Sequence, residues 1–297
     1  MSLTVSYASG VSDKPLLGVP ISLLFDQIVD QFAQREAVVS IHQNTRLNYS
    51  QLAERVNELA KAFIAAGFEK GDRVGVWSPN NIEWLVTQYA TAKVGVVLVT
   101  INPAYRTHEL AYVLEQSGCK GLVFQNQFKT SDYEAMVVEL CPNLNMIGPG
   151  KLNSVKFPNL KTIVSMTSSA VSGIYNWDEF LDLAKNSSDE QLHTRQSGQD
   201  MDDAINIQYT SGTTGFPKGA TLSHHNILNN GYFVAATMNF TEADRLVIPV
   251  PLYHCFGMVM GNLGCLTHGA CAIYPSEGFD PEAALQAVQA EKATALY

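Results

Sequence analysis

Residues 204–219 read AINIQYTSGTTGFPKG and join a predicted strand to a loop that cannot build a hydrophobic core. The first five residues alternate apolar and polar side chains, as a β-strand does. The next eleven, residues 209–219, contain three glycines, four small hydroxyl side chains and one lysine. A helical pattern follows from about His225. The sequence therefore predicts a small, polar, glycine-rich connection between a strand and a helix.

Strand-like and helix-like segments alternate along most of the remaining sequence. Helical periodicity covers residues 24–32, 52–63, 82–94 and 109–116. Short apolar or β-branched runs predict strands at residues 37–41, 73–77, 95–99, 121–124 and 162–165. Ser50 is the predicted N-cap of the second helix, and residues 185–203, rich in Ser, Gln and Asp, are predicted to form a linker or a long surface loop. This alternation predicts an α/β fold with parallel sheets flanked by helices.

The composition limits the classes of partner. The chain has 297 residues, 46% of them hydrophobic and 16% charged, which is typical of a globular protein. Its formal net charge is −9 and it contains no run of Lys or Arg, so a nucleic-acid partner is not expected. No apolar stretch approaches the ~20 residues that cross a bilayer, so no transmembrane segment is expected.

The N-terminal sequence bears on location. It contains Asp13 and no arginine before Arg35, unlike an Arg-rich presequence, and it lacks the pattern of a signal peptide. We therefore expect a cytoplasmic protein, with a mitochondrial location as the alternative if a presequence is missing. The five cysteines are odd in number and lack C-x-x-C spacing, which indicates reduced thiols. Cys265, His268 and Cys271 have ligand-like spacing but no second ligand pair, so a structural metal is not favoured.

The glycine-rich loop has the composition of a phosphate-binding site. Glycine allows the backbone to approach an anion closely, the hydroxyl groups add donors, and Lys218 adds positive charge. The loop is not a Walker A motif, because Pro217 stands where that motif needs its second glycine. On composition alone, an ordinary surface loop remains the alternative.

The stretch YTSGTTGFPKG closely resembles the phosphate-binding signature of the AMP-forming adenylating enzymes, a superfamily that includes the acyl-CoA synthetases. The resemblance extends to ATLSHHN at residues 220–226, PVPLYHCFG at 249–257 and VTINP at 99–103. It runs from about Ser22 to the last residue and is closest to the medium-chain fatty acyl-CoA synthetase branch. The resemblance implies that the chain is a partial N-terminal AMP-binding domain of interleaved subdomains. Residues 21–203 would be its early α/β segments, and residues 204–297 the phosphate-loop segment and the start of an acyl pocket.

The resemblance also implies a reaction and its participants. A fatty acid attacks the α-phosphorus of ATP to give an acyl-adenylate, and coenzyme A then takes the acyl group. Lys218 would stabilise charge on the polyphosphate, and Thr210 would lie near Mg²⁺. The residues that wrap the phosphates would be Thr210, Ser211, Gly212, Thr213, Thr214, Gly215, Phe216, Pro217 and Lys218.

A second implied site residue is His254, at the position that separates the nucleotide and acyl pockets in the family. There it would orient the carboxylate or gate the acyl tunnel; a histidine that only packs its loop is the alternative. The apolar residues that follow it are expected to form mainly helix core, because Met and Leu at helical spacing usually do. They are Phe256, Met258, Val259, Met260 and Leu263.

In the family that this sequence resembles, the pattern continues beyond the position of Tyr297, to the adenine and ribose sites and to a C-terminal lid domain with a catalytic lysine. We therefore expect an incomplete part of the enzyme that is inactive alone. A non-catalytic nucleotide-binding or interaction module, or a ligase for an aryl acid, are the alternatives. We also expect residues 22–68 to pack near residues 245–297, with an uncovered sheet edge that allows self-association.

Overall fold

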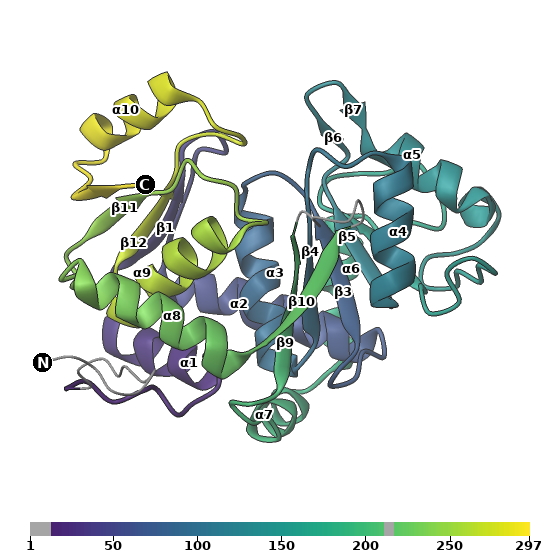
Figure 1. Ribbon diagram of the computed structural model, residues 1–297. Coiled ribbons are helices and arrows are strands. Elements are labelled where there is room, and N and C mark those ends of the chain that lie inside the picture. Colours follow the sequence, from purple (N-terminus) through teal and green to yellow (C-terminus); the bar gives the residue numbers. More distant parts are fainter. Residues whose placement is uncertain (1–12, 211–216) are drawn as a thin grey trace, which may run out of the picture.

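Two β-sheets lie side by side in the computed structural model, which describes residues 13–210 and 217–297 (Figure 1). The larger sheet has the strand order β10-β9-β4-β3-β5-β8. Neighbouring strands are parallel except β10, which runs antiparallel to β9. Its strands are β3 (Arg73–Trp77), β4 (Val97–Ile101), β5 (Gly121–Phe124), β8 (Thr162–Ser165), β9 (Ala204–Thr210) and β10 (Lys218–Ser223).

The second sheet has five strands in the order β13-β11-β12-β1-β2 and joins distant parts of the sequence. Val38 of β1 pairs with Ala272 of β12 in parallel, which confirms that the early residues pack on the late ones. The strands are β1 (Glu36–Ser40), β2 (Thr45–Asn48), β11 (Arg245–Val247), β12 (Cys271–Tyr274) and β13 (Ala295–Leu296). A separate short hairpin consists of β6 (Gln127–Phe128) and β7 (Ser131–Asp132).

Helices cover the sheets, so the predicted α/β fold is confirmed. The α-helices are α1 (Ile21–Phe32), α2 (Tyr49–Ala65), α3 (Ile82–Val94), α4 (Thr107–Ser117), α5 (Tyr133–Leu140), α6 (Trp177–Asp182), α7 (Asp189–Ser197), α8 (His224–Thr237), α9 (Gly264–His268) and α10 (Pro281–Ala290). Two short 3₁₀ helices, η1 (Pro142–Met146) and η2 (Leu183–Asn186), and one π-helix, η3 (Phe256–Leu263), complete the described elements. Helix α3 lies between the two sheets (Figure 1). Its residues 84–94 are all buried, including the polar Thr87, Gln88, Thr91 and Lys93.

Three local predictions were wrong. Asn48, not Ser50, caps α2: its side chain accepts from the Gln51 backbone, and the Gln51 side chain accepts from the Asn48 backbone in return. Gly95 adopts a left-handed conformation (φ 70°) that ends α3, so the next strand begins at Val97 rather than at residue 95. Residues 185–203 are not a continuous loop, because they contain α7, which Ser188 and Gln191 cap in the same reciprocal way.

Side-chain contacts hold the first fifty residues to the last sixty. The Tyr49 hydroxyl donates to the Ala270 carbonyl (2.8 Å) in the buried core. Nearer the surface, Arg245 donates to Glu36 (2.6 Å) and to Glu291 (2.8 Å). Arg46 forms ion pairs with the same two carboxylates. These four side chains form an ion-pair network that joins β1, β2, β11 and the end of α10.

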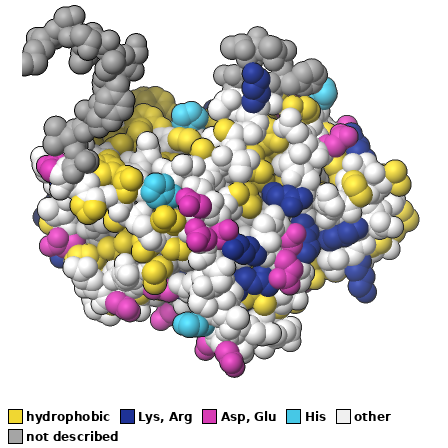
Figure 2. Space-filling model, turned by 60° about the horizontal axis from the view of Figure 1, so that its bottom comes forward, with side chains coloured by type: hydrophobic (Ala, Val, Ile, Leu, Met, Phe, Trp, Pro, Cys, Tyr) yellow, Lys and Arg dark blue, Asp and Glu magenta, His cyan; other side chains and the backbone are white. Residues whose placement is uncertain are grey.

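Charge is unevenly distributed on the face shown in Figure 2. Lys and Arg side chains gather on the half that carries the six-stranded sheet, whereas Asp and Glu predominate on the other half. The chain is acidic as a whole, so this half provides a local positive region.

Candidate functional site

The carboxyl edge of the six-stranded sheet collects the polar loops that sequence analysis singled out. Strands β3, β4 and β9 are parallel neighbours, so the segments that leave their carboxyl ends meet at one edge of the sheet. The loop after β3 begins at Ser78, the segment after β4 contains Asn102, and β9 ends at Thr210. Ligands of open α/β sheets bind at this kind of edge.

The two ends of the glycine-rich loop lie against each other. Lys218, the first residue of β10, pairs across the ladder with Thr210, the last residue of β9. The Thr210 hydroxyl donates to the Lys218 carbonyl over 3.5 Å, a long contact, and both residues are exposed. Tyr112 of α4 donates its hydroxyl to the Pro217 carbonyl (3.1 Å) and so anchors the end of the loop.

Six of the predicted phosphate-binding residues lie outside the described residues: Ser211, Gly212, Thr213, Thr214, Gly215 and Phe216. The described ends nevertheless define where that segment starts and stops. Because Thr210 and Lys218 are ladder partners, the two described ends of the loop lie at neighbouring positions of the sheet.

Gln208 connects the glycine-rich loop to the segment that carries His254. It lies on β9, two residues before Thr210, and only 3% of its surface is exposed. Its amide donates to the Tyr253 carbonyl (2.6 Å), and its carbonyl oxygen lies 3.5 Å from the Cys255 sulfur. The two motifs are therefore neighbours in space, because a buried side chain two residues before Thr210 bonds to the segment that carries His254.

Asn80 holds the other side of the same segment. Its side-chain amide donates to the Val250 carbonyl (2.9 Å), and its side-chain oxygen accepts from the Leu252 backbone (2.8 Å). The Asn80 side chain thus bonds to one backbone carbonyl and one backbone N–H group of the segment, as a neighbouring β-strand would. A side chain at Gly257 would place its Cβ 2.5 Å from the Pro251 carbonyl oxygen, so the turn also requires glycine there. Residues 250–257 are thus tightly constrained.

His254 is exposed at the start of the helical run that includes η3. Its Nδ1 atom accepts a hydrogen bond from the Phe256 backbone (3.2 Å), so in the neutral ring the proton is on Nε2. The ring is therefore oriented by its own loop with Nε2 left as the available atom. The imidazole therefore caps the helical run through Nδ1 and keeps the Nε2–H group as a donor for a ligand.

The apolar residues after His254 form the π-helix η3, a rare element that is often found at functional sites. Met258, Val259 and Leu263 are buried in the main core, which agrees with the expectation of helix core. Phe256 and Met260 are half-buried; the Phe256 ring packs 4.8 Å from that of Tyr297, and Tyr297 donates to the Met260 carbonyl (3.1 Å).

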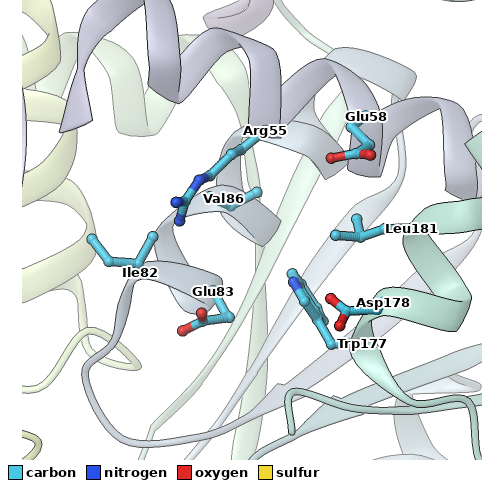
Figure 3. A pocket seen from close by; sticks show the side chains of 8 residues that line it. All are labelled: Arg55, Glu58, Ile82, Glu83, Val86, Trp177, Asp178 and Leu181. Atoms are coloured by element: carbon cyan, nitrogen blue, oxygen red, sulfur yellow. The ribbon is translucent and has the colours of Figure 1, made fainter. Parts of the chain in front are cut away.

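A cavity of about 260 Å³ lies away from these motifs, between α2, α3 and α6 (Figure 3). In the close view the Trp177 ring lies between Glu83 and Asp178, with Arg55 and Glu58 above them. None of the described residues predicted for phosphate, metal or acyl binding lines this cavity. It is therefore not the site that the sequence motifs define.

Gln208 and Asn80 were missed by sequence analysis. One signal was present for Gln208: a large polar residue within a strand otherwise flanked by apolar residues is unusual in a buried parallel sheet. Asn206 on the same strand gives the same signal, and its amide donates to the Leu98 carbonyl (2.9 Å). No local pattern marked Asn80, whose partners lie some 170 positions away.

The fold is that of the N-terminal domain of adenylating enzymes. The structure superimposes on an anthranilate CoA ligase, AuaEII, solved with anthranoyl-AMP, with a TM-score of 0.79 and 19% identity, over 96% of this chain and 50% of that one. It also superimposes on the ATP-bound MatB of Rhodopseudomonas palustris with a TM-score of 0.69 and 26% identity, over 92% of this chain and 48% of that one.

The chain belongs to the AMP-binding enzyme family, whose profile matches residues 25–297. It is 42% identical over 297 residues to the mitochondrial medium-chain acyl-CoA ligase ACSF2 of Mus musculus, covering 99% of this chain and 48% of that protein. It is 43% identical over 282 residues to the putative acyl-CoA synthetase YngI of Bacillus subtilis, covering 95% and 51%. The chain thus spans about half the length of the curated relatives it matches.

Proposed function

We propose that this chain forms part of an ATP-dependent ligase that activates a medium-chain fatty acid to an acyl-adenylate and then to acyl-CoA. The observation that carries the proposal is the bond between Gln208 and Tyr253, which holds the His254 segment beside the end of β9, where the glycine-rich loop begins. Adenylation needs a polyphosphate and a carboxylate to be positioned together, and positioning supplies much of the rate. The names of the mouse and Bacillus relatives support the choice of acid and of thioester product.

In this proposal the ends of the loop act on the polyphosphate. The Lys218 ammonium stabilises the charge that develops on the departing pyrophosphate, together with the backbone and hydroxyl donors of residues 211–216. His254 offers its Nε2 atom to the acid, because its Nδ1 atom is occupied by the Phe256 backbone. Thr210 begins the loop and is exposed; its hydroxyl donates to the Lys218 carbonyl, which leaves the lone pairs of the hydroxyl oxygen for a ligand.

Mg²⁺ fits this arrangement as a partner of ATP rather than as a metal held by the protein alone. The described residues contain no group of three His, Cys, Asp or Glu side chains that could hold a metal ion. A Thr210 hydroxyl beside phosphate oxygens and water matches the oxygen ligands that Mg²⁺ prefers. The ion, when bound, neutralises phosphate charge, and coenzyme A is the proposed acyl acceptor.

The test is ATP–pyrophosphate exchange dependent on added acid. Octanoate and an aryl acid such as anthranilate are compared, both on the 297-residue chain and on the longest product that the gene encodes. We expect octanoate-dependent exchange by the longer product and little by this chain alone. Exchange with the aryl acid only would make an aryl acid, not a fatty acid, the proposed substrate. No exchange with either acid would reject the proposed ligase activity.

One observation favours a second candidate, a non-catalytic nucleotide-binding or interaction module. The chain spans about half the length of its curated relatives, and adenylation needs all its groups around one phosphorus. Pyrophosphate or ATP binding by the 297-residue chain, measured by titration calorimetry, together with no exchange by any product of the gene, would support this candidate.

We further propose a cytoplasmic location, residues 1–297 as a partial N-terminal AMP-binding domain, and self-association through β13, the edge strand of the five-stranded sheet. The described helices include none long and apolar enough to cross a membrane. The mouse relative is named mitochondrial. The location is tested by fusing residues 1–35 to a reporter; if mitochondria import the fusion, the proposed location becomes mitochondrial. Light scattering at rising concentration tests self-association.

A further inference from the structure

The segment from Met146 to Lys161, which we call the lysine loop, combines positive charge with exposed apolar side chains. It carries Lys151, Lys156 and Lys161, and no Asp or Glu occurs between Glu139 and Asp178. None of the three lysines takes part in the ion pairs found among the described residues. In a chain of net charge −9, this is a concentrated positive segment without internal neutralisation.

The same loop exposes the two most accessible large apolar side chains of the described chain. Val155 is fully exposed and Met146 is 75% exposed. Isolated exposed apolar residues are ordinary, but here both lie within one lysine-bearing segment. In Figure 1 this segment lies at the outer end of the molecule, beyond α4 and away from the five-stranded sheet.

The loop presents these side chains from a fixed base. Leu152, Phe157 and Leu160 are buried against the core that α4 and β5 share. The Phe157 backbone donates to the Ser154 hydroxyl (3.1 Å), which closes a turn with Val155 and Lys156 at its tip. The exposure of Val155 therefore does not come from a frayed segment, and its presentation costs little ordering entropy on binding.

We propose that the lysine loop docks this protein on an anionic lipid surface. Lysines near such a surface are attracted by its negative potential, and small apolar tips beside them enter the interface between headgroups and acyl chains. A nucleic acid is a poorer match, because the loop has no arginine and its one aromatic ring, Phe157, is buried. One carboxylate, Glu115, lines the cavity behind the tip together with Val155 and Lys156. Its single negative charge offsets at most one of the three lysine charges.

This surface is separate from the candidate ligase site, so the proposal does not depend on the proposed function. Lys161 precedes β8, and therefore lies at the amino end of the sheet, opposite the carboxyl edge that carries Thr210. Docking through the lysine loop leaves that edge accessible.

Sedimentation with vesicles tests the proposal on the 297-residue chain. Phosphatidylcholine vesicles with and without phosphatidylglycerol are compared at low and high sodium chloride. We expect binding only to the anionic vesicles, weakened by salt. Replacing Lys151, Lys156 and Lys161 by Glu should lower the partition coefficient by about tenfold or more. The matched control reverses three exposed lysines elsewhere, Lys14, Lys185 and Lys292, for the same change in net charge.

Equal losses in the loop variant and the control would overturn the proposal, because binding would then follow net charge alone. Absence of binding to anionic vesicles at low salt would overturn it as well. Val155→Trp supplies a second readout: brominated lipids should quench its fluorescence if the tip enters the bilayer. Salt-sensitive binding without that quenching would show a polyanion surface effect and reject docking through the lysine loop.

Discussion

Lys218 opens β10 directly opposite Thr210, so its charge lies at the end of the loop rather than in the core. We expect Lys218→Ala, in the longest product of the gene, to slow acyl-adenylate formation by about tenfold or more, because a charged hydrogen bond to the polyphosphate is lost. Thioester formation from supplied acyl-adenylate should change much less, since pyrophosphate has left by then. Single-turnover measurements of the two half-reactions check this. Equal losses in both would assign Lys218 a general structural role.

His254 combines a capping bond with a free ring nitrogen, and two substitutions separate these roles. His254→Ala removes both and should raise the Michaelis constant for the fatty acid while lowering stability by about 1 kcal/mol. His254→Asn keeps an acceptor for the Phe256 backbone and removes the imidazole. Thermal unfolding measures the change in stability, and kinetics at varied fatty acid concentration measure the change in the Michaelis constant. If the Asn variant handles fatty acid normally, His254 only caps its loop.

Sequence patterns predicted single residues well where the deciding contacts are local. The bounds of β3, β5 and β8 agree with the predicted residues 73–77, 121–124 and 162–165, because alternation and β-branching are short-range signals. At α2 both Asn48 and Ser50 are good caps, and Gln51, three residues after Asn48, decides between them.

Gln208 and Asn80 were beyond sequence analysis for a physical reason. Their partners lie 45 and 170 positions away, so only the folded chain shows which carbonyl each amide satisfies. The same limit applies to the candidate site. The sequence shows the glycine-rich loop and the His254 segment as two separate motifs. It does not show the hydrogen bond from Gln208 to Tyr253 that brings them together.

At the scale of elements, α8 packs against η3 and α9 through a close backbone contact at Gly231. A Cβ there would lie 2.8 Å from the Val259 carbonyl oxygen and 3.1 Å from the Gly264 nitrogen. We expect Gly231→Ala to lower the free energy of unfolding by about 1–3 kcal/mol, since neither helix can move away without loss of packing. Chemical denaturation measures the change.

Gly264 is the matched control on the facing helix. A Cβ at Gly264 would be 3.5 Å from the Gly231 carbonyl oxygen and 3.6 Å from Ala235, which is ordinary contact. Gly264→Ala should therefore be neutral or stabilising by up to about 1 kcal/mol through helix propensity. A loss of stability equal to that of Gly231→Ala would show that the helix contact is less specific than its geometry indicates.

At the scale of the whole molecule, the ion-pair network makes stability depend on pH. The hydrogen bond from Arg46 holds the pKa of Glu291 below its ordinary value of 4.5, although burial opposes this. Burial also opposes the lowering at Glu36, where the bonds from Arg245 and Arg46 prevail and the pKa falls. Because both folded-state pKa values lie below those of the unfolded chain, this contribution is fully present above pH 4.5 and is lost as the pH falls through the folded-state values.

We expect Glu291→Gln to lower the free energy of unfolding at neutral pH by roughly 2 kcal/mol, because charged hydrogen bonds to a buried carboxylate are weakened. The difference from the parent should shrink as the pH falls below 4.5. Glu54→Gln, at an exposed position in the middle of α2, is the control and should change little. A Glu291→Gln penalty that stays constant down to acid pH would mean that packing, not charge, is responsible.

The pairing of β1 with β12 has a consequence for how the chain is made. Tyr49 and Ala270 are hydrogen-bonded across 221 positions, so the ribosome releases the first strand long before its partner exists. During that interval the apolar face of α1 and the β1–β2 hairpin have no sheet to join, and such surfaces are prone to aggregate. The six-stranded sheet, in contrast, has acquired β3, β4, β5 and β8 by residue 165. We infer that synthesis passes through an intermediate in which the six-stranded sheet can form while β1 and β2, of the other sheet, still wait for β12.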